Sequence, residues 1–186
     1  MELESIEFDN GMVGKIWHDD YAADPRKEWD NLATMICFHG RYNLGDHPQI
    51  VDWGQYSSFD EVEKAILRRV GPCVILPMYM LDHSGIMVST TDFNDKWDSG
   101  QIGFVYVSYA RLREEMRWKN ITKDRIKRAY EWLEAEVQIY GDYLEGNVFG
   151  YTLENREGDE VDSCWGYYGY KHCLEELESI AKSYKE

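Results

Sequence analysis

The sequence lacks the features by which membrane, secreted and disulfide-rich proteins are usually recognised. No run approaches the roughly 18 consecutive apolar residues that a membrane span requires, and the first residues, Met1-Glu2-Leu3-Glu4, have neither the basic nor the apolar part of a signal peptide. The four cysteines form no C-x-x-C pair, which predicts reduced thiols in place of disulfides or zinc ligands. We therefore expect a cytoplasmic protein that does not interact with membranes.

Common catalytic and cofactor motifs are also missing. The sequence contains no GxGxxG, Walker A, G-x-S-x-G or HExxH pattern, which excludes the usual nucleotide-binding, serine-hydrolase and zinc-protease sites. His39 follows Cys37 at two residues and His47 directly follows Asp46, but such spacings occur freely in proteins without metals. The sequence predicts neither a metal site nor a cofactor.

Basic residues are few and unevenly placed. The chain has 20 Lys and Arg against 35 Asp and Glu, a formal net charge of -15. Residues 111–130 hold eight basic against three acidic side chains, whereas residues 131–186 hold fourteen acidic against four basic ones. Phosphate binding requires Lys and Arg to replace counterions, so this field repels free nucleic acid and favours a basic partner protein. The same charge could also serve only to keep the protein in solution.

Short apolar runs bounded by turn residues predict several strands. Residues 3–8 and 12–17 flank the turn Asp9-Asn10-Gly11 and predict a β-hairpin. Further strands are expected at residues 32–39, 73–81, 86–90, 101–108, 148–153 and 161–168. Pro77 cannot donate a ladder hydrogen bond, so the strand at 73–81 should either bulge there or lie at an edge.

Capping residues and helical periodicity predict the helices. Ser58-Phe59-Asp60-Glu61 has the spacing of a capping box, and Gly71-Pro72 ends the apolar pattern that follows it. Further helices are expected at residues 108–118, from Thr122 to Gly141 or Gly146, and at residues 171–184.

The order of these elements determines the fold class. Strands and helices come in runs, which favours α+β over a doubly wound sheet. The sequence predicts a mainly antiparallel, twisted sheet with three to four helices packed against it. With four prolines, no internal repeat and no linker, we expect a single domain over residues 1–186.

Three polar clusters near strand ends could form a site. They are Asp82-His83-Ser84-Gly85, Trp97-Asp98-Ser99-Gly100 and Asp162-Ser163-Cys164-Trp165. A carboxylate can fix the tautomer of an imidazole, which can then move a proton. Because adjacent residues of a strand point to opposite faces, we expect His83 to meet Asp98, Asp162 or Cys164 in space rather than Asp82.

The same clusters also fit purely structural roles. In that interpretation Asp82 accepts backbone N–H bonds in a tight turn in which Gly85 takes a positive φ. Trp97 then anchors its loop and Asp98 forms an Asx turn. Cys164 would be a buried structural thiol, since the neighbouring Asp162 disfavours a thiolate.

The C-terminal third also offers a candidate protein-binding surface. Aromatic side chains dominate the energetics of protein interfaces, and a basic partner would require carboxylates beside them. The predicted partner-binding residues are Glu154, Glu157, Asp159, Glu160, Tyr167 and Tyr168. A solvated acidic face is the alternative interpretation.

Four strings of the sequence carry a resemblance to a known family. They are Cys37-Phe38-His39 with Arg41-Tyr42-Asn43-Leu44-Gly45-Asp46, Leu76-Pro77 with Asp82-His83-Ser84-Gly85-Ile86, Trp97-Asp98-Ser99-Gly100-Gln101-Ile102-Gly103, and Asp162-Ser163-Cys164-Trp165-Gly166. Over roughly residues 32–170 the chain resembles small accessory proteins of tailed phages, plasmids and related mobile elements. No reaction is established for that family, so the resemblance implies a context and no catalytic residue. Small acidic proteins of such elements often disarm host defence, many of them as DNA mimics or as plugs on a nuclease.

These observations lead to one hypothesis and two alternatives. The first is an anti-CRISPR or anti-restriction inhibitor that binds the basic channel of a host defence nuclease in the host cytoplasm. The second is a small hydrolase-like enzyme that uses His83 as base with Asp98 or Asp162, and with Cys164 as a further candidate. The third is a phage structural or replication accessory protein that binds a phage-encoded partner.

Overall fold

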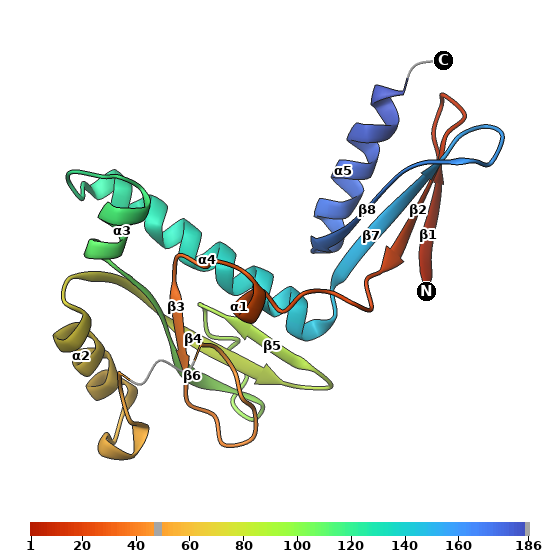
Figure 1. Cartoon of the computed structure of the whole chain (residues 1–186). Helices are drawn as coiled ribbons and strands as arrows, with labels where there is room; N and C mark the ends of the chain where they lie inside the picture. The colour runs from red at the N-terminus through yellow and green to blue at the C-terminus, as the bar shows by residue number, and fades with distance from the viewer. Residues whose placement is uncertain (47–49, 185–186) are drawn as a thin grey trace. The chain divides into compact units, whose positions relative to one another are not determined.

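A computed structural model describes residues 1–46 and 50–184, and the chain divides into two compact units (Figure 1). Unit 1 consists of Met1–Asp24 and Asp142–Glu186, and unit 2 of Pro25–Gly141. Each unit has its own four-stranded antiparallel sheet, and the described residues form five α-helices. The α+β class and the antiparallel pairing are therefore confirmed, with two sheets in place of one. The expectation of a single domain stays a prediction.

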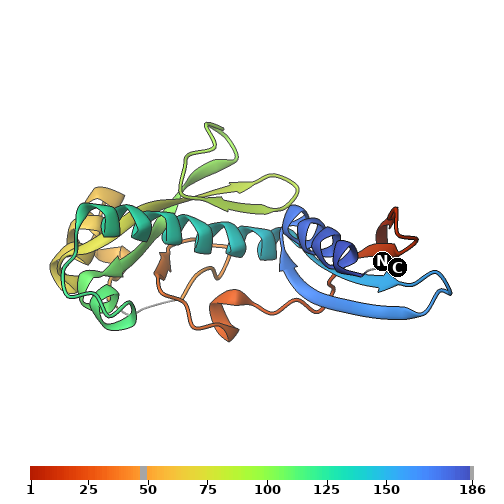
Figure 2. The ribbon, with the colours of Figure 1, turned by 90° about the horizontal axis from the view of Figure 1, so that it is seen from above.

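Unit 1 is built from two hairpins and one helix. Its sheet has the order β1-β2-β7-β8, with β1 at Glu2–Glu7, β2 at Val13–His18, β7 at Val148–Glu154 and β8 at Glu160–Tyr168. The β1–β2 hairpin was predicted from its turn, and β7 and β8 were predicted as strands. Helix α5, Tyr170–Ser183, lies along one face of this sheet in both ribbon views (Figures 1 and 2).

The core of unit 1 lies between α5 and this sheet. Ile16, Leu153, Cys173 and Leu177 are fully buried there. The backbone of Gly14 approaches α5 so closely that a Cβ atom would lie 2.8 Å from Leu177.

Unit 2 has a sheet of order β3-β6-β4-β5. Its strands are β3 at Thr34–Cys37, β4 at Cys73–Asp82, β5 at Ile86–Ser89 and β6 at Ser99–Ser108. Strand β6 begins two residues before the predicted start because Ser99 and Gly100 pair with Leu81 and Met80. This extension brings the segment around Asp98 beside the end of β4.

Pro77 lies at a local edge of the sheet, which is one of the two predicted alternatives. The β4–β5 pairing begins only at Tyr79, so at Pro77 strand β4 has β6 on one side and no partner strand on the other. A register irregularity follows between Met78 and Tyr79. The residue that lacks an N–H therefore lies where the ladder is incomplete.

Four helices belong wholly or largely to unit 2. They are α1 at Pro25–Glu28, α2 at Phe59–Val70, α3 at Tyr109–Glu115 and α4 at Lys123–Glu145, and a 3-10 turn, η1, covers Trp53–Gln55. Helix α2 packs Val62 and Ile66 onto Phe104. Helix α4 ends before Gly146, which takes a φ of 73°, the second of the two predicted ends.

The cap of α2 differs in detail from the predicted capping box. The Ser58 hydroxyl accepts a hydrogen bond from the N–H of Glu61 at 3.4 Å, as expected. The Glu61 carboxylate, however, accepts from the N–H and the hydroxyl of Ser57 at 2.9 and 3.0 Å, not from Ser58. These hydrogen bonds, the backbone one above all, lower the pKa of Glu61.

Candidate functional site

An open polar pocket of about 710 Å³ lies at one end of the sheet of unit 2. Three segments form it: the end of β4, the loop that follows β3, and the segment that leads into β6. Its lining residues are His39, Gly40, Arg41, Met80, Asp82, Trp97, Asp98, Ser99, Gly100, Gln101 and Ile102. Two of the three predicted polar clusters therefore meet at one pocket.

His83 and Asp98 form the polar pair at the edge of this pocket. The Nδ1 atom of His83 lies 3.1 Å from the Oδ2 atom of Asp98, one of the three partners that the sequence predicted. The backbones are joined as well, because the N–H of Asp82 donates to the carbonyl of Asp98 at 2.9 Å. Both side chains are largely exposed, 72% for His83 and 43% for Asp98. This pair can exchange a proton with bulk water.

Asp82 has a different role from the one expected of a turn residue. Its Oδ2 atom accepts hydrogen bonds from Arg41 Nη1 at 3.1 Å and from the Tyr42 hydroxyl at 3.0 Å. It thus holds the loop after β3 against the end of β4. The positive φ of the turn belongs to Ser84, at 62°, and not to Gly85. The structural interpretation of this turn was therefore wrong in both details.

The loop before β6 is organised by Asp95, which the sequence reasoning did not identify. Its Oδ1 atom accepts from the N–H groups of Asp98 and Trp97 at 2.9 and 2.8 Å, and these bonds lower the pKa of Asp95. Asp95 is therefore the Asx-turn residue, and the carboxylate of Asp98 is left to face His83. Trp97 does not anchor the loop, because its side chain is 94% exposed.

The tautomer of His39 follows from its hydrogen bonds. Its Nδ1 atom accepts from the backbone N–H of Tyr42 at 3.2 Å and of Arg41 at 3.4 Å. A nitrogen that accepts must carry its lone pair, so the proton of the neutral ring is on Nε2. The ring stacks on Tyr42 with centroids 5.1 Å apart. His39 is thereby fixed as a potential N–H donor beside the pocket.

The pocket suits binding of a polar group better than covalent catalysis. Its hydroxyl candidate, Ser99, donates to the Asp95 carbonyl at 2.5 Å, and a backbone carbonyl is not a base that could activate it. A nucleophile normally requires an adjacent base within hydrogen-bond reach. The imidazole of His83 with Asp98 can still move a proton to or from a bound water or ligand.

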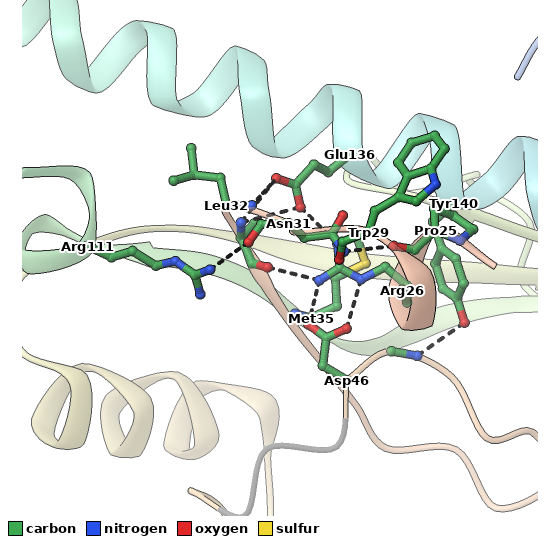
Figure 3. Close-up of polar contacts among 12 residues, drawn as sticks. Pro25, Arg26, Trp29, Asn31, Leu32, Met35, Asp46, Arg111, Glu136 and Tyr140 are labelled. Atoms are coloured by element: carbon green, nitrogen blue, oxygen red, sulfur yellow. Dashed lines mark hydrogen bonds and ion pairs between the residues drawn. The ribbon is translucent and has the colours of Figure 1, made fainter. Parts of the chain in front are cut away.

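A buried charged network supports the loop that carries His39 and Arg41, and the sequence reasoning missed it (Figure 3). The Arg26 side chain, only 3% exposed, lies between Asp46 and Glu136. It donates to Asp46 through Nε at 2.8 Å and Nη2 at 2.5 Å, to Glu136 at 2.8 Å and to the Ala33 carbonyl at 2.9 Å. Burial alone would lower the pKa of Arg26, but the two carboxylates outweigh it and the pKa is raised.

The carboxylates of this network also fix the backbone around β3. Glu136 accepts from the N–H groups of Leu32 and Ala33, and Asp46 accepts from the N–H of Met35 at 2.8 Å (Figure 3). Asp46 therefore holds the end of the pocket loop to β3. Nothing in the sequence indicates these ion pairs, because Asp46 and Glu136 lie 20 and 110 residues from Arg26 along the chain.

The third predicted cluster belongs to unit 1. Asp162 and Cys164 lie on β8, the edge strand of that sheet, whereas His83 and Asp98 belong to unit 2. Cys164 is exposed, so its interpretation as a buried thiol was wrong. The reason is that no further strand of the sheet covers β8.

The predicted partner-binding residues differ in their exposure. Glu157, Asp159 and Glu160 are exposed at the turn between β7 and β8. Glu154 is half-buried and forms an ion pair with Lys15. Tyr167 is also half-buried, and burial raises its pKa. Tyr168 is 9% exposed and its hydroxyl donates to the carbonyl of Ala23, so little of its surface can reach a partner.

The net charge is concentrated in unit 1. That unit contains 18 Asp and Glu against five Lys and Arg, a formal net charge of -13. Unit 2 contains 17 against 15, a net of -2, although it is the larger unit. The acidity is thus a property of one folding unit and not of the whole surface.

Two negative findings apply to the described part of the chain. Within residues 1–46 and 50–184, no group of three or more His, Cys, Asp or Glu side chains could hold a metal ion, and His47 lies outside the described residues. None of the described helices combines the length and the apolar character needed to cross a bilayer.

No protein-family model, no curated protein and no solved structure matches this chain. The geometry and the charge distribution are therefore the basis of the functional proposal.

Proposed function

We propose that this chain is an acidic binding protein whose unit 1 occupies a basic, nucleic-acid-binding surface of another protein. The observation that carries the proposal is the charge of -13 on unit 1 against -2 on unit 2. A field used only for solubility has no reason to be confined to one unit. A concentrated field attracts a basic surface at long range and raises the rate of association.

The proposed partner is a host defence nuclease of the CRISPR or restriction type. Such enzymes carry basic channels for DNA, and the resemblance to accessory proteins of phages and plasmids supplies a context in which blocking them is useful. A protein with this charge competes with DNA for the channel without binding DNA itself. The exposed carboxylates of the β7–β8 turn, Glu157, Asp159 and Glu160, are the proposed contacts.

DNA cleavage by a panel of purified restriction and CRISPR nucleases, with and without the protein, tests this proposal. We expect inhibition of at least one enzyme, and loss of that inhibition between about 50 mM and about 500 mM salt as the Debye length shortens. Inhibition that is independent of salt, or no effect on any member of the panel, contradicts the proposal.

The chain offers a matched pair of variants for the same assay. The variant E157K/E160K reverses two exposed charges of unit 1, and E114K/E134K reverses two exposed charges of unit 2. Both change the net charge equally. A loss of inhibition confined to the first variant assigns the effect to unit 1, whereas equal losses point to net charge alone.

A second candidate function rests on the pair of His83 Nδ1 and Asp98 Oδ2 at 3.1 Å beside the 710 Å³ pocket. We propose, as the alternative, that this pair acts as an acid–base group on a polar ligand bound between Arg41 and His39. The variants His83→Gln and Asp98→Asn should then abolish activity against a panel of phosphodiester and peptide substrates. Absence of activity in the wild-type protein rejects this alternative.

A further inference from the structure

The face of the unit 1 sheet opposite α5 carries a groove of about 550 Å³ with aromatic walls. Its lining residues are Met1, Trp17, His18, Asp19, Asp20, Tyr21 and Trp165, and we call it the aromatic groove. All of these residues belong to unit 1. None of them takes part in the polar pocket of unit 2.

The two tryptophans lie on strands on either side of β7. Trp17 of β2 is opposite Gly150 in the β2–β7 register, and its Nε1–H donates to the Thr152 hydroxyl at 3.2 Å. A Cβ atom on Gly150 would lie only 2.3 Å from the Trp165 ring, so that ring lies directly over the glycine backbone. Glycine is therefore required here for both indoles to lie on one face of the sheet.

The third aromatic residue and the charges come from the loop after β2. Tyr21 is 96% exposed, and its backbone N–H donates to Asp19 Oδ1 at 3.0 Å. Asp19 is itself tied to β7, because its N–H donates to the Val148 carbonyl at 2.8 Å. Asp20 is exposed beside it. The loop thus places two carboxylates at the edge of an aromatic surface.

Aromatic rings beside carboxylates favour a cationic organic group as the ligand. The faces of indole and phenol rings carry negative electrostatic potential and attract cations within about 6 Å. The neighbouring cation Lys15 is ion-paired with Glu154 and does not neutralise the groove. A ligand that donates hydrogen bonds gains further from the two carboxylates, and a quaternary ammonium has no N–H group to donate.

A guanidinium group meets all of these requirements. It is planar, so its face can stack on an indole while its edge donates to a carboxylate, and it is less strongly hydrated than the ammonium of lysine. We propose that the aromatic groove binds the guanidinium of an arginine side chain of the partner protein. This inference rests on the proposed function, because a basic nucleic-acid-binding surface is the source of the arginine.

The test uses a small probe, so it does not require the partner. Protein labelled with ¹⁵N at tryptophan is titrated with N-acetyl-L-arginine N-methylamide, and the indole N–H signals are followed by NMR. The control is the citrulline analogue, which has nearly the same shape and no charge. The variants Trp17→Phe and Trp165→Phe assign the two signals.

We expect the signals of Trp17 and Trp165 to shift saturably with the arginine probe, and the citrulline probe to bind at least about fivefold more weakly. Trp97 is the internal control, because it is 94% exposed and lies in unit 2. Equal affinities of the two probes, or equal shifts of Trp97, overturn the proposal.

A second variant keeps the test valid if an aromatic substitution disturbs the sheet. This variant combines Asp19→Asn with Asp20→Asn. Asparagine at position 19 retains an oxygen that can accept from the N–H of Tyr21, and the side chain at position 20 is exposed. The double variant should weaken binding of the arginine probe at least about threefold and leave binding of the citrulline probe unchanged. Unchanged arginine binding overturns the role of the carboxylates.

The two proposals fail in different ways. Binding of the arginine probe without inhibition of any nuclease rejects the proposed function and leaves a guanidinium site. Inhibition of a nuclease without binding of the probe rejects the guanidinium site and leaves the acidic surface.

Discussion

Replacing Arg26 with methionine tests whether the buried charge network organises unit 2. Methionine has an unbranched apolar side chain about as long as the aliphatic stem of arginine, so the substitution removes mainly the guanidinium. It leaves the carboxylates of Asp46 and Glu136, 22% and 17% exposed, without their shared cation. The carbonyl of Ala33 also loses a donor.

The magnitude follows from this geometry. Removing one member of a buried, hydrogen-bonded ion pair typically costs about 3–5 kcal/mol, because the remaining charges stay desolvated. We expect Arg26→Met to lower the free energy of unfolding by this amount.

Urea denaturation, followed by circular dichroism, measures the effect. The control is Arg41→Met, which removes the same group from an ion pair with Asp82 in which Arg41 is 74% exposed. Solvent screens such a pair, and we expect the stability of this variant to stay close to that of the wild type. Equal losses in the two variants would refute the reasoning, as would a stability of Arg26→Met within experimental error of the wild type.

Three further outcomes are expected. Gly103→Ala should destabilise unit 2 by more than about 2 kcal/mol in urea denaturation. The Cβ atom of the alanine would lie 1.9 Å from the Ile36 carbonyl oxygen, so β3 and β6 must separate. A variant as stable as the wild type would contradict this. Iodoacetamide should label Cys164 before the other three cysteines at a pH of about 8, because this thiol is exposed. Mass spectrometry of tryptic peptides measures the order of labelling. Burial raises the pKa of Cys37 and Cys173 to about 12 from 9.0. The unfolded chain then releases these protons at lower pH than the folded chain. The free energy of unfolding should therefore fall as the pH rises from 9.0 to about 12. A urea midpoint that stays constant over this range would contradict the raised pKa of the two thiols.

Local signals predicted the elements of the fold well. Asp9-Asn10-Gly11 lies between β1 and β2 as expected, and Ser58 and Ser108 cap α2 and α3 through their hydroxyls. These features are local because turn and cap residues act on backbone groups within a few positions. The division into two sheets was not predicted, because it depends on the pairing of β2 with β7 across most of the chain.

The candidate site was only partly predictable for the same reason. The meeting of His83 and Asp98 could be inferred because both lie at the ends of neighbouring strands, 15 residues apart. The ion pairs of Arg26 span 20 and 110 residues and depend on helix α1, which has no strong periodic signal in its four residues. The exposure of Trp97 and Cys164 and the burial of Tyr168 depend on what packs against each side chain in the folded chain, and hydrophobicity alone does not determine that.

The central claim is that the acidity of unit 1 creates a binding surface for a basic nuclease. The most direct measurement is the inhibition constant of E157K/E160K against that of E114K/E134K, on the same nuclease and at the same low salt. We expect a loss of inhibition of at least about tenfold for the first variant and of less than about twofold for the second. Equal inhibition constants for the two variants would contradict it.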